Sequence, residues 1–390
     1  RKALRYIIPI VNKHWDEMED FKYTNQRMMY VEKLIHHTNT NQALFDFDEW
    51  FPKFPTYLRR SAIAKALGIV SSYRSNLEKW EREGKCQVPK LSLTHFTYPA
   101  YYKGNLFRNF DPIRQTIELK VFKNGDWVYD IYQLKTSDCN YYQNYLSGKK
   151  QNVPIIQKKG HHFYATFSYE EETTLIPEES IAKICAIDLG LNTDATCSVM
   201  DKDGTVYARK FISFSKEHDR LHTQLGRIKR NQKRGSRHNK TLWRKVAGIS
   251  QDIADKTEKA ILDFGNEHGV DVFVLEHLDF KGKSAVKRAH FWRYKRIYKV
   301  LSQKAHQHGL RVARVNAQNT SRLAFDGSGW SKRGLEIAPD TPYSMMQFVT
   351  GKIYNADLNA SYNIGARYFI RTLLKTVTVT QRLALEAKVP

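Results

Sequence analysis

The sequence predicts an α/β layer in the C-terminal half, preceded by all-β and helical parts, and three observations support this fold class. From residue 181 onward, apolar strands alternate with helical stretches, which is typical of helices packed on a largely buried sheet. Residues 90–180 contain short segments in which polar and apolar residues alternate, as in half-buried strands. Residues 13–85 have a helical pattern, so the first half predicts a small barrel with a helical domain inserted in it.

The N-terminal half is expected to begin with a strand, because residues 1–10 (RKALRYIIPI) form a short apolar run. The helices that follow include a basic helix over residues 57–80, with one internal break near Gly68. Glycine in a helix interior costs about 1 kcal/mol relative to alanine, which is the reason for expecting the break. Further strands are predicted at residues 117–122, 126–134 and 161–170.

In the C-terminal half, the apolar segments 181–189 and 271–278 predict two buried strands. Two more strands, ATCSVMD and VYARKFI, follow the first of these segments. The other predicted elements are a basic helical region over about 216–268, a helix over about 284–307, a strand at 311–316 and a last helix over 357–370.

The composition points to a polyanionic partner. Lysine and arginine number 63 and aspartate and glutamate number 40, so the formal net charge is +23. This excess is far beyond what solubility requires, and a nucleic acid is the simplest explanation. There is no apolar run of about 18 residues, so the sequence does not predict a membrane partner. The aromatic residues include 22 tyrosines and 7 tryptophans; most belong to a core, but some are expected to stack on unpaired bases.

Four cysteines are present, Cys86, Cys139, Cys185 and Cys197. No two of them form a C-x-x-C pair, which argues against a disulfide framework and against a cysteine zinc site. The sequence is therefore interpreted as that of an intracellular, reduced protein without zinc.

Three acids stand where a buried sheet does not favour them. Asp188 ends one apolar strand, Glu276 ends another, and Asp357 begins the last helix. Ligands gather at the carboxyl ends of strands in α/β folds, and carboxylates brought together there need cations. Each acid alone is more simply a helix cap, a turn cap or an ion-pair partner. Together they predict a site for Mg²⁺ or Mn²⁺, with two ions that hydrolyse a phosphodiester.

Two basic runs without acids flank the strand of Glu276. Residues Arg227–Lys245 contain nine lysines or arginines, and Lys281–Lys299 contain eight, interleaved with aromatic residues. A charged run is usually a solvated helix face, and the aromatics of the second run could anchor its helix instead. The two runs together favour nucleic-acid binding, with the candidates Arg227, Lys229, Arg230, Lys233, Arg234, Arg237, Lys287, Arg288, Trp292, Arg293 and Arg296.

The segments AIDLGLNTDATCSVMDKDG, VFVLEHLDF and NADLNASYNIGARY, which contain Asp188, Glu276 and Asp357, resemble the three split parts of a RuvC-type nuclease domain. Their order, the helix YLRRSAIAKALGIVSSYRSNLEKW and the phrase NTSRLAFDGSG resemble the TnpB family, transposon-encoded RNA-guided nucleases related to compact type V CRISPR effectors. The resemblance implies an RNase H-like nuclease domain with the three acids as metal ligands and catalytic residues. It also implies a guide RNA, cleavage of double-stranded DNA beside a short flanking motif, and a prokaryotic cytoplasm or nucleoid as the location.

The resemblance also implies a domain division. The expected parts are the first strand of a wedge β-barrel (1–10), a helical recognition domain (11–88), the wedge barrel (89–180), the nuclease domain (181–316 and 353–376), a cysteine-less remnant of a zinc-ribbon region (317–352) and a C-terminal tail (377–390). Many relatives have four cysteines in the remnant. Here Ala324, Gly327 and Thr350 stand at cysteine positions, so no zinc is expected. Arg322 of this segment is a further candidate for nucleic-acid contact.

The flanking DNA duplex is expected to be read by the helical segment. The candidates are Arg59, Arg60, Ser71, Ser72 and Tyr73, although the two arginines could touch only phosphates. Two alternatives to a guided nuclease remain open. One is an RNA-guided DNA-binding repressor that does not cut. The other is an unguided RuvC-like nuclease or transposase, which would have no use for the large first half.

Overall fold

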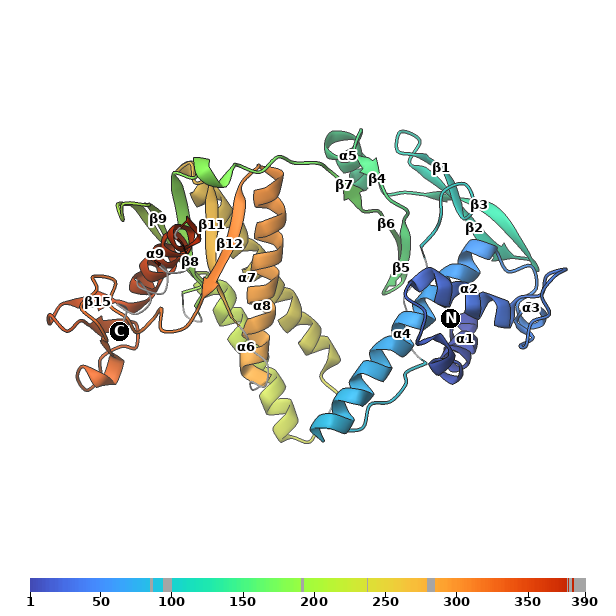
Figure 1. The fold of residues 1–390 in the computed structure, drawn as a ribbon, viewed down its shortest axis with the longest axis horizontal. Coiled ribbons are helices and arrows are strands. Elements are labelled where there is room, and N and C mark those ends of the chain that lie inside the picture. Colours follow the sequence, from blue (N-terminus) through green and yellow to red (C-terminus); the bar gives the residue numbers. More distant parts are fainter. Residues whose placement is uncertain are drawn as a thin grey trace. The chain divides into compact units, whose positions relative to one another are not determined.

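The computed structural model divides the chain into two compact units, Arg1–Glu172 and Thr173–Pro390 (Figure 1). It describes residues 1–390 except 85–86, 94–99, 191–192, 237, 279–284, 377, 379–380 and 382–390, and except the side chains of residues 159, 285–292 and 376. None of the helices in the described part is long and apolar enough to span a membrane.

Helices form the first part of unit 1. α1 and α2 pack against the long α4, and the apolar side chains between them form one buried core with Ile7, Val31, Phe47 and Ile63 fully inaccessible to solvent. The helices are α1 (Lys2–Lys13), a 3₁₀ turn (Asp16–Met18), α2 (Thr24–Ile35), α3 (Phe47–Trp50) and α4 (Thr56–Glu83).

The predicted strand at residues 1–10 is wrong, because this segment belongs to helix α1. Its buried residues are Ala3, Leu4, Ile7, Ile8, Ile10 and Val11, and this spacing places them along one broad face of a helix. Packing of that face on α4 outweighs the cost of Pro9 in the helix interior. A short apolar run does not by itself distinguish a strand from a buried helix.

The break predicted near Gly68 is also wrong, since α4 runs without interruption from Thr56 to Glu83. The helix ends at Gly84, whose φ of 60° is the left-handed conformation typical of a glycine after a helix. Ile63, Ala66, Leu67 and Val70 on either side of Gly68 are buried. Their burial stabilises the helix by more than the glycine costs.

Three small antiparallel sheets follow. β2 and β3, each of eight residues, form a hairpin, and β1 pairs with β2. α5 connects this sheet to two strand pairs, β4 with β7 and β5 with β6. These pairings among the described residues do not close a barrel, so the predicted wedge barrel is not confirmed. The elements are β1 (Phe107–Asp111), β2 (Thr116–Lys123), β3 (Asp126–Gln133), α5 (Thr136–Tyr145), β4 (Lys150–Gln151), β5 (Ile155–Lys159), β6 (His162–Thr166) and β7 (Tyr169–Glu170).

Unit 2 is built on a five-stranded mixed sheet in the order β10-β9-β8-β11-β12. β8, β9 and β10 are antiparallel neighbours, whereas β11 runs parallel to both β8 and β12. The strands are β8 (Lys183–Asp188), β9 (Ala195–Asp201), β10 (Val206–Ile212), β11 (Val272–His277) and β12 (Arg311–Asn316), and a 3₁₀ turn (Glu178–Ser180) precedes them.

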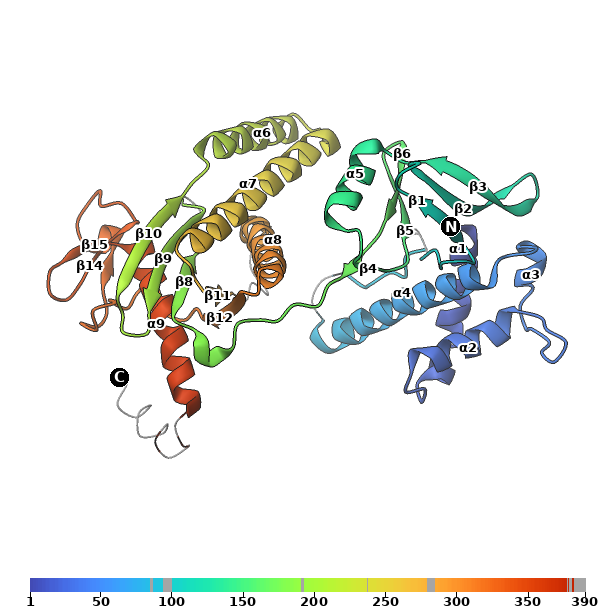
Figure 2. The ribbon, with the colours of Figure 1, turned by 90° about the horizontal axis from the view of Figure 1, so that it is seen from above.

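Helices cover both faces of this sheet. α7 and α8 pack on the face that carries Cys185, Cys197 and Phe273. α9 packs on the opposite face, against Ile184, Val274 and their neighbours (Figure 2). The predicted α/β layer is therefore confirmed. The helices of this unit are α6 (Ser215–Lys233), α7 (Lys240–Glu267), α8 (Ala285–Gln307) and α9 (Ala356–Thr376).

A short segment between β12 and α9 forms a small sheet of its own, in the order β13-β14-β15. Its strands are β13 (Lys332–Arg333), β14 (Met345–Gln347) and β15 (Ile353–Asn355), with a 3₁₀ turn (Gly334–Glu336) after β13. Met346, Phe348, Ala324 and Ala356 form its buried cluster. This segment corresponds to the predicted cysteine-less region.

Gly265 on α7 provides a test of the core of unit 2. A Cβ atom at this position would lie 2.3 Å from Cζ of the fully buried Phe273. We expect Gly265→Ala to lower the free energy of unfolding by about 1–3 kcal/mol, the usual range for overpacking. Gly248→Ala on the same helix meets nothing within 4 Å, so it should instead stabilise by about 0.5–1 kcal/mol. Thermal unfolding of both variants measures this, and equal melting temperatures would contradict the packing described.

Candidate active site

The three acids singled out in the sequence lie at one edge of the central sheet. Asp188 is the last residue of β8, and Glu276 is next to last in the neighbouring parallel strand β11. Asp357 lies in the first turn of α9, which begins where the small sheet ends. The Oδ1 atom of Asn355 accepts hydrogen bonds from the backbone N–H groups of Asp357 and Leu358, at 3.0 and 2.9 Å. This cap fixes the start of the helix.

The pKa of Asp188 depends on the charges of the other two carboxyl groups. Burial raises the pKa of Asp188 well above its ordinary value, the negative charges of Glu276 and Asp357 raise it further, and Arg333 opposes the rise. Burial also raises the pKa of Glu276 and of Asp357. Three desolvated acids, with the charges of two of them acting on Asp188, favour the binding of cations.

Neighbouring groups already engage two of the acids. The hydroxyl of the buried Thr320 donates a hydrogen bond to Oε1 of Glu276. A guanidinium N–H of Arg333 lies 3.4 Å from Oδ1 of Asp357. The hydroxyl of Tyr294 donates to the backbone carbonyl of Glu276. Each contact lowers the freedom of a carboxylate or of the strand that carries it.

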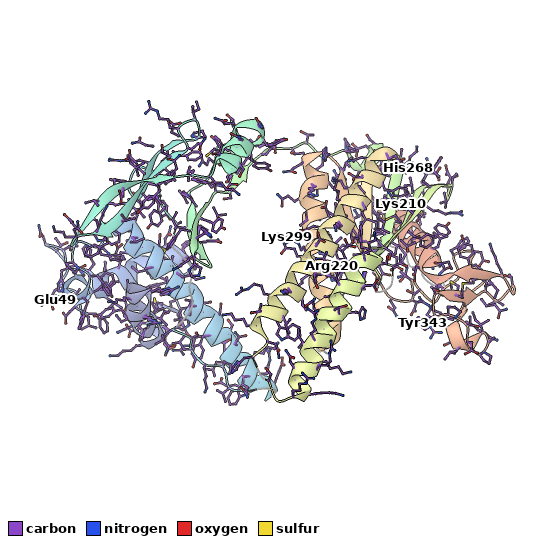
Figure 3. All side chains as sticks on the ribbon, turned by 180° about the vertical axis from the view of Figure 1, so that it is seen from behind. Glu49, Lys210, Arg220, His268, Lys299 and Tyr343 are labelled. Atoms are coloured by element: carbon purple, nitrogen blue, oxygen red, sulfur yellow. The ribbon has the colours of Figure 1, made fainter. Side chains whose placement is uncertain are left out.

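Arg333 is held in turn by Tyr343, a residue labelled in Figure 3. Its Nε donates to the backbone carbonyl of Tyr343 at 2.8 Å, and its guanidinium lies 4.4 Å from the centre of the tyrosine ring. The sequence analysis missed Arg333 because nothing in its local pattern distinguishes it from other basic residues. Thr320 lies in the phrase NTSRLAFDGSG that suggested the family, so a signal existed there.

The donor chemistry of the three acids fits a hard divalent cation, since all are carboxylate oxygens. The arrangement is not yet a coordination shell: within the described part of the chain, no three His, Cys, Asp or Glu side chains are grouped closely enough to hold a metal ion. The guanidinium of Arg333 supplies the positive charge nearest to Asp357. Asp188, Glu276 and Asp357 are the residues that would hold Mg²⁺ or Mn²⁺, and zinc content stays a prediction.

Two asparagines of α9 connect the helix to the turn that carries Thr320. The Nδ2 atom of Asn363 donates to the carbonyl oxygens of Thr320 and Leu323, at 2.8 and 2.7 Å. Asn359 is fully buried, and its amide donates to the carbonyl of Leu323 at 2.8 Å and accepts from the N–H of Phe325 at 2.9 Å. Because Asp357 is on the same helix, these amides link the positions of two acids.

Aromatic packing completes the same region. The ring of Phe325 contacts the rings of Phe348, Tyr354 and Tyr362 in edge or tilted arrangements, with centroids 4.9–5.5 Å apart. Hydrogen bonds and aromatic contacts thus connect residues 319–355 with one another and with α9. Cys139, Cys185 and Cys197 are buried, carry free thiols and lie elsewhere in the fold.

Two arginines of α4 that were predicted to contact nucleic acid form ion pairs with an acid of α2. Arg59 is only 3% exposed and lies 3.2 Å from Glu32. The partly exposed Arg60 contacts the same carboxylate at 3.0 Å. Ser71 and Ser72 are exposed on α4, and the half-buried Tyr73 follows them. The two serines remain accessible to a ligand, whereas Arg59 does not.

The basic residues of unit 2 also divide into two groups. Arg293 is 8% exposed and lies 3.7 Å from the buried Asp194. Arg296 contacts Asp255 at 2.6 and 2.9 Å, and Arg322 contacts Glu336 at 2.8 Å. Arg237 and the side chains of Lys287, Arg288 and Trp292 lie outside the described residues. The exposed candidates, all on or next to α6, are Arg227, Lys229, Arg230, Lys233 and Arg234.

The fold and site together define an α/β domain with three acids at the carboxyl ends of its strands and at the start of its last helix. The model of the Aq_aa04 family matches residues 1–123. No curated protein matches. A Cas12f1–sgRNA–target DNA complex is similar with a TM-score of 0.39, 15% identity, and coverage of 92% of this chain and 93% of the other.

Two further solved structures are similar. C2c1 from Alicyclobacillus acidoterrestris in complex with single-guide RNA gives a TM-score of 0.47 and 13% identity, and the match covers 95% of this chain and 67% of that one. RuvC from T. thermophilus in complex with a Holliday junction substrate gives 0.29 and 8%, with 49% and 96% covered. At these levels of similarity the function must be argued from the residues themselves.

Proposed function

We propose that the chain is an RNA-guided endonuclease that cuts double-stranded DNA beside a short flanking motif. The observation that carries this is the set of three carboxyl groups at one edge of a buried sheet, where burial and the charges of Glu276 and Asp357 raise the pKa of Asp188. Stability alone does not favour such a set, because each desolvated charge costs free energy. Perturbed acids that gather at a site are a common mark of catalysis.

The residues have distinct roles in this proposal. Asp188, Glu276 and Asp357 would hold the divalent metal, which would supply an activated water and neutralise charge on the scissile phosphate. Thr320 orients Glu276 through its hydroxyl. Arg333, at 3.4 Å from Asp357, stabilises the carboxylate and presents N–H donors suited to a phosphate oxygen. Two ions, Mg²⁺ or Mn²⁺, are the expected cofactor.

A guide RNA accounts for the rest of the chain. The exposed basic side chains of α6 and a net charge of +23 suit the phosphates of a guide–target heteroduplex, which a protein recognises by shape while base pairing reads the sequence. Unit 1 has no catalytic task, and we assign it to holding RNA and reading the flanking duplex, with Ser71, Ser72 and Tyr73 of α4 as readers. These features fit a TnpB-like protein of a prokaryotic cytoplasm or nucleoid.

The decisive experiment compares cleavage of a matched duplex by protein freed of RNA, with and without added guide. The guide is obtained by sequencing the RNA that copurifies with the protein. We expect cutting only when protein, guide and Mg²⁺ are all present, and a scrambled guide is the control. Sequence-specific cutting without RNA would instead identify an unguided nuclease or transposase.

A guided repressor that does not cut is the second candidate. The contact between Arg333 and Asp357 favours it, because a guanidinium at this carboxylate competes with a metal ion. The same experiment separates the two functions. A repressor would bind the matched duplex tightly in the presence of guide and Mg²⁺ and leave both strands intact.

A further inference from the structure

An open groove runs along the edge strand β12 and the adjacent side of α9. One cavity of about 720 Å³ is lined by β12, by His277 of β11 and by Tyr368 and Arg371 of α9. A second cavity of about 420 Å³ continues it towards Gln318, Asn319 and Arg367. The two share the lining residues Arg314, Val315, Asn316 and Arg371. They therefore form one continuous groove along β12, the last strand in the order of the five-stranded sheet.

Arginines dominate the lining of this groove. Arg367 donates to the carbonyl of Asn316 at 2.7 Å, and Arg371 donates to the carbonyl of Arg314 at 2.9 Å. Arg311 donates to the carbonyl of Ile176. A carbonyl fixes the direction of a guanidinium but does not neutralise its charge, and each guanidinium retains further N–H donors.

The remaining groups support an anionic ligand. The guanidinium of the exposed Arg314 lies 4.7 Å from the ring centre of Tyr298, and this contact also leaves its charge in place. Glu178 is the acid that lines the groove, and it already has a cationic neighbour, Lys375, at 3.4 Å. Four guanidinium groups, three of them oriented by hydrogen bonds to carbonyls, are well matched to phosphates.

The groove ends next to the candidate active site. His277, which lines it, directly follows Glu276, and Asn319 directly precedes Thr320, whose hydroxyl donates to Glu276. Arg367 is close enough to Glu276 that its charge lowers the pKa of that carboxyl, against the rise caused by burial. A chain of phosphates in the groove would therefore lead directly to the acids.

We propose that this groove of Arg311, Arg314, Arg367 and Arg371 binds the sugar–phosphate backbone of the DNA strand that the acidic edge cuts. The inference rests on the proposed nuclease function and deepens it. The exposed apolar Ile370, which lines the groove with Leu374, provides contact area for sugars and bases. Single strands bind in this way to grooves that combine cations with apolar faces. The guide RNA has the same phosphate chemistry, so the test must separate the two.

The experiment uses the full chain with its copurified RNA and with Asp188→Asn, so that DNA is not consumed. The variant is Arg314→Gln with Arg371→Gln, and the probe is a fluorescent oligothymidine that does not pair with the guide. The matched control is Lys202→Gln with Lys259→Gln, two exposed lysines of the same unit. Anisotropy titrations over a range of KCl concentrations give the affinity and its dependence on salt.

We expect the arginine variant to bind the oligonucleotide about 10-fold or more weakly at low salt. The slope of log K against log salt should fall by about 1.4, since each lost phosphate contact on a single strand contributes about 0.7. The lysine control should keep the parental slope. The double variant Arg314→Lys, Arg371→Lys should keep most of the parental slope, because both charges remain. Melting curves of the lysine and glutamine variants check that a fall in slope does not come from misfolding.

Two outcomes would overturn the proposal. An unchanged slope in a folded glutamine variant would show that the strand passes elsewhere. A loss of copurified RNA with undiminished oligothymidine binding would assign the groove to the guide. Because the assay measures binding and not cleavage, failure of the proposed nuclease function would leave its result valid. Conversely, if the double variant Arg314→Gln, Arg371→Gln carries out guided cleavage at the parental rate, the groove does not bind the cut strand, and the nuclease function stands.

Discussion

Changing Asp188 to Asn should abolish cleavage of guided DNA and, at the same time, raise the thermal stability of the metal-free protein. In the proposed function the carboxylate of Asp188 binds metal and the reaction depends on its charge, so we expect a reduction of about 1,000-fold or more, the upper part of the range for a group that stabilises transition-state charge. Guide-directed binding of the duplex should change little, because Asp188 lies at the site and not on the basic helix α6.

The stability change has a definite sign and pH dependence. The folded-state pKa of Asp188 lies above its ordinary value, so the native state prefers the neutral carboxyl. Below the ordinary carboxyl pKa the two proteins should therefore be about equally stable. As the pH rises towards the raised pKa, the parental protein loses stability and Asp188→Asn does not. We expect a difference on the order of 1–3 kcal/mol, the cost of one buried uncompensated group.

Melting curves with and without MgCl₂ complete this test. Mg²⁺ should raise the melting temperature of the parental protein. At a Mg²⁺ concentration 100 times Kd, its free energy of unfolding should rise by about 2.7 kcal/mol. It should have little effect on Asp188→Asn. Asp203→Asn, at an exposed turn of the same unit, is the control. If Asp188→Asn cuts at the parental rate, or if Mg²⁺ raises the melting temperature of both proteins equally, Asp188 is not part of the active site.

Replacing Asn359 by Ala should cost about 1–3 kcal/mol of stability, because it leaves the N–H of Phe325 without its acceptor and removes one of the two amide donors to the carbonyl of Leu323. The turn that carries Thr320 would loosen as well, so cleavage should fall at least 10-fold, as when a group that positions a catalytic residue is lost. Asn266→Ala, at an exposed position of α7, is the matched control and should be close to neutral.

The same variant tests whether hydrogen bonds stand in place of zinc in residues 317–352. Purified protein should contain no stoichiometric zinc, and a zinc-selective chelator should not change the melting temperature. If Asn359→Ala melts like Asn266→Ala while the chelator destabilises the parental protein, the segment depends on metal. One zinc per chain by elemental analysis would lead to the same conclusion.

The sequence predicted the central sheet of unit 2 well, because β8 and β11 are largely buried and carry continuous apolar runs. It failed at α1, where the apolar run was too short to show its period and packing on α4 decided the structure. The three acids were recognisable because each follows such a strand or begins a helix. Arg333 was not, since its contact with Asp357 depends on a tertiary fold of residues 332–355.

The basic candidates show the same division between local and tertiary information. The α6 residues Arg227, Lys229 and Arg230 are exposed as a charged helix face should be. Arg59 and Arg293 belong to similar basic stretches, yet each is buried beside an acid from a distant part of the chain. Composition identifies a basic segment, but it does not indicate which guanidinium groups are neutralised internally. That information comes only from the packing of Glu32 and Asp194.

The placement of Asp357 on the last helix has a consequence for synthesis of the protein. α9 packs on β8 and β9, and its Leu358, Ile364 and Tyr368 cover the sheet face that contains Ile184 and Val274. A ribosome adds about 5–20 residues per second, so Asp188 and Glu276 emerge seconds before the third acid. Until α9 emerges and docks, the nascent chain exposes an apolar sheet face and has only two of its three acids. An unfinished chain therefore lacks one of the three acids that the proposed cleavage requires.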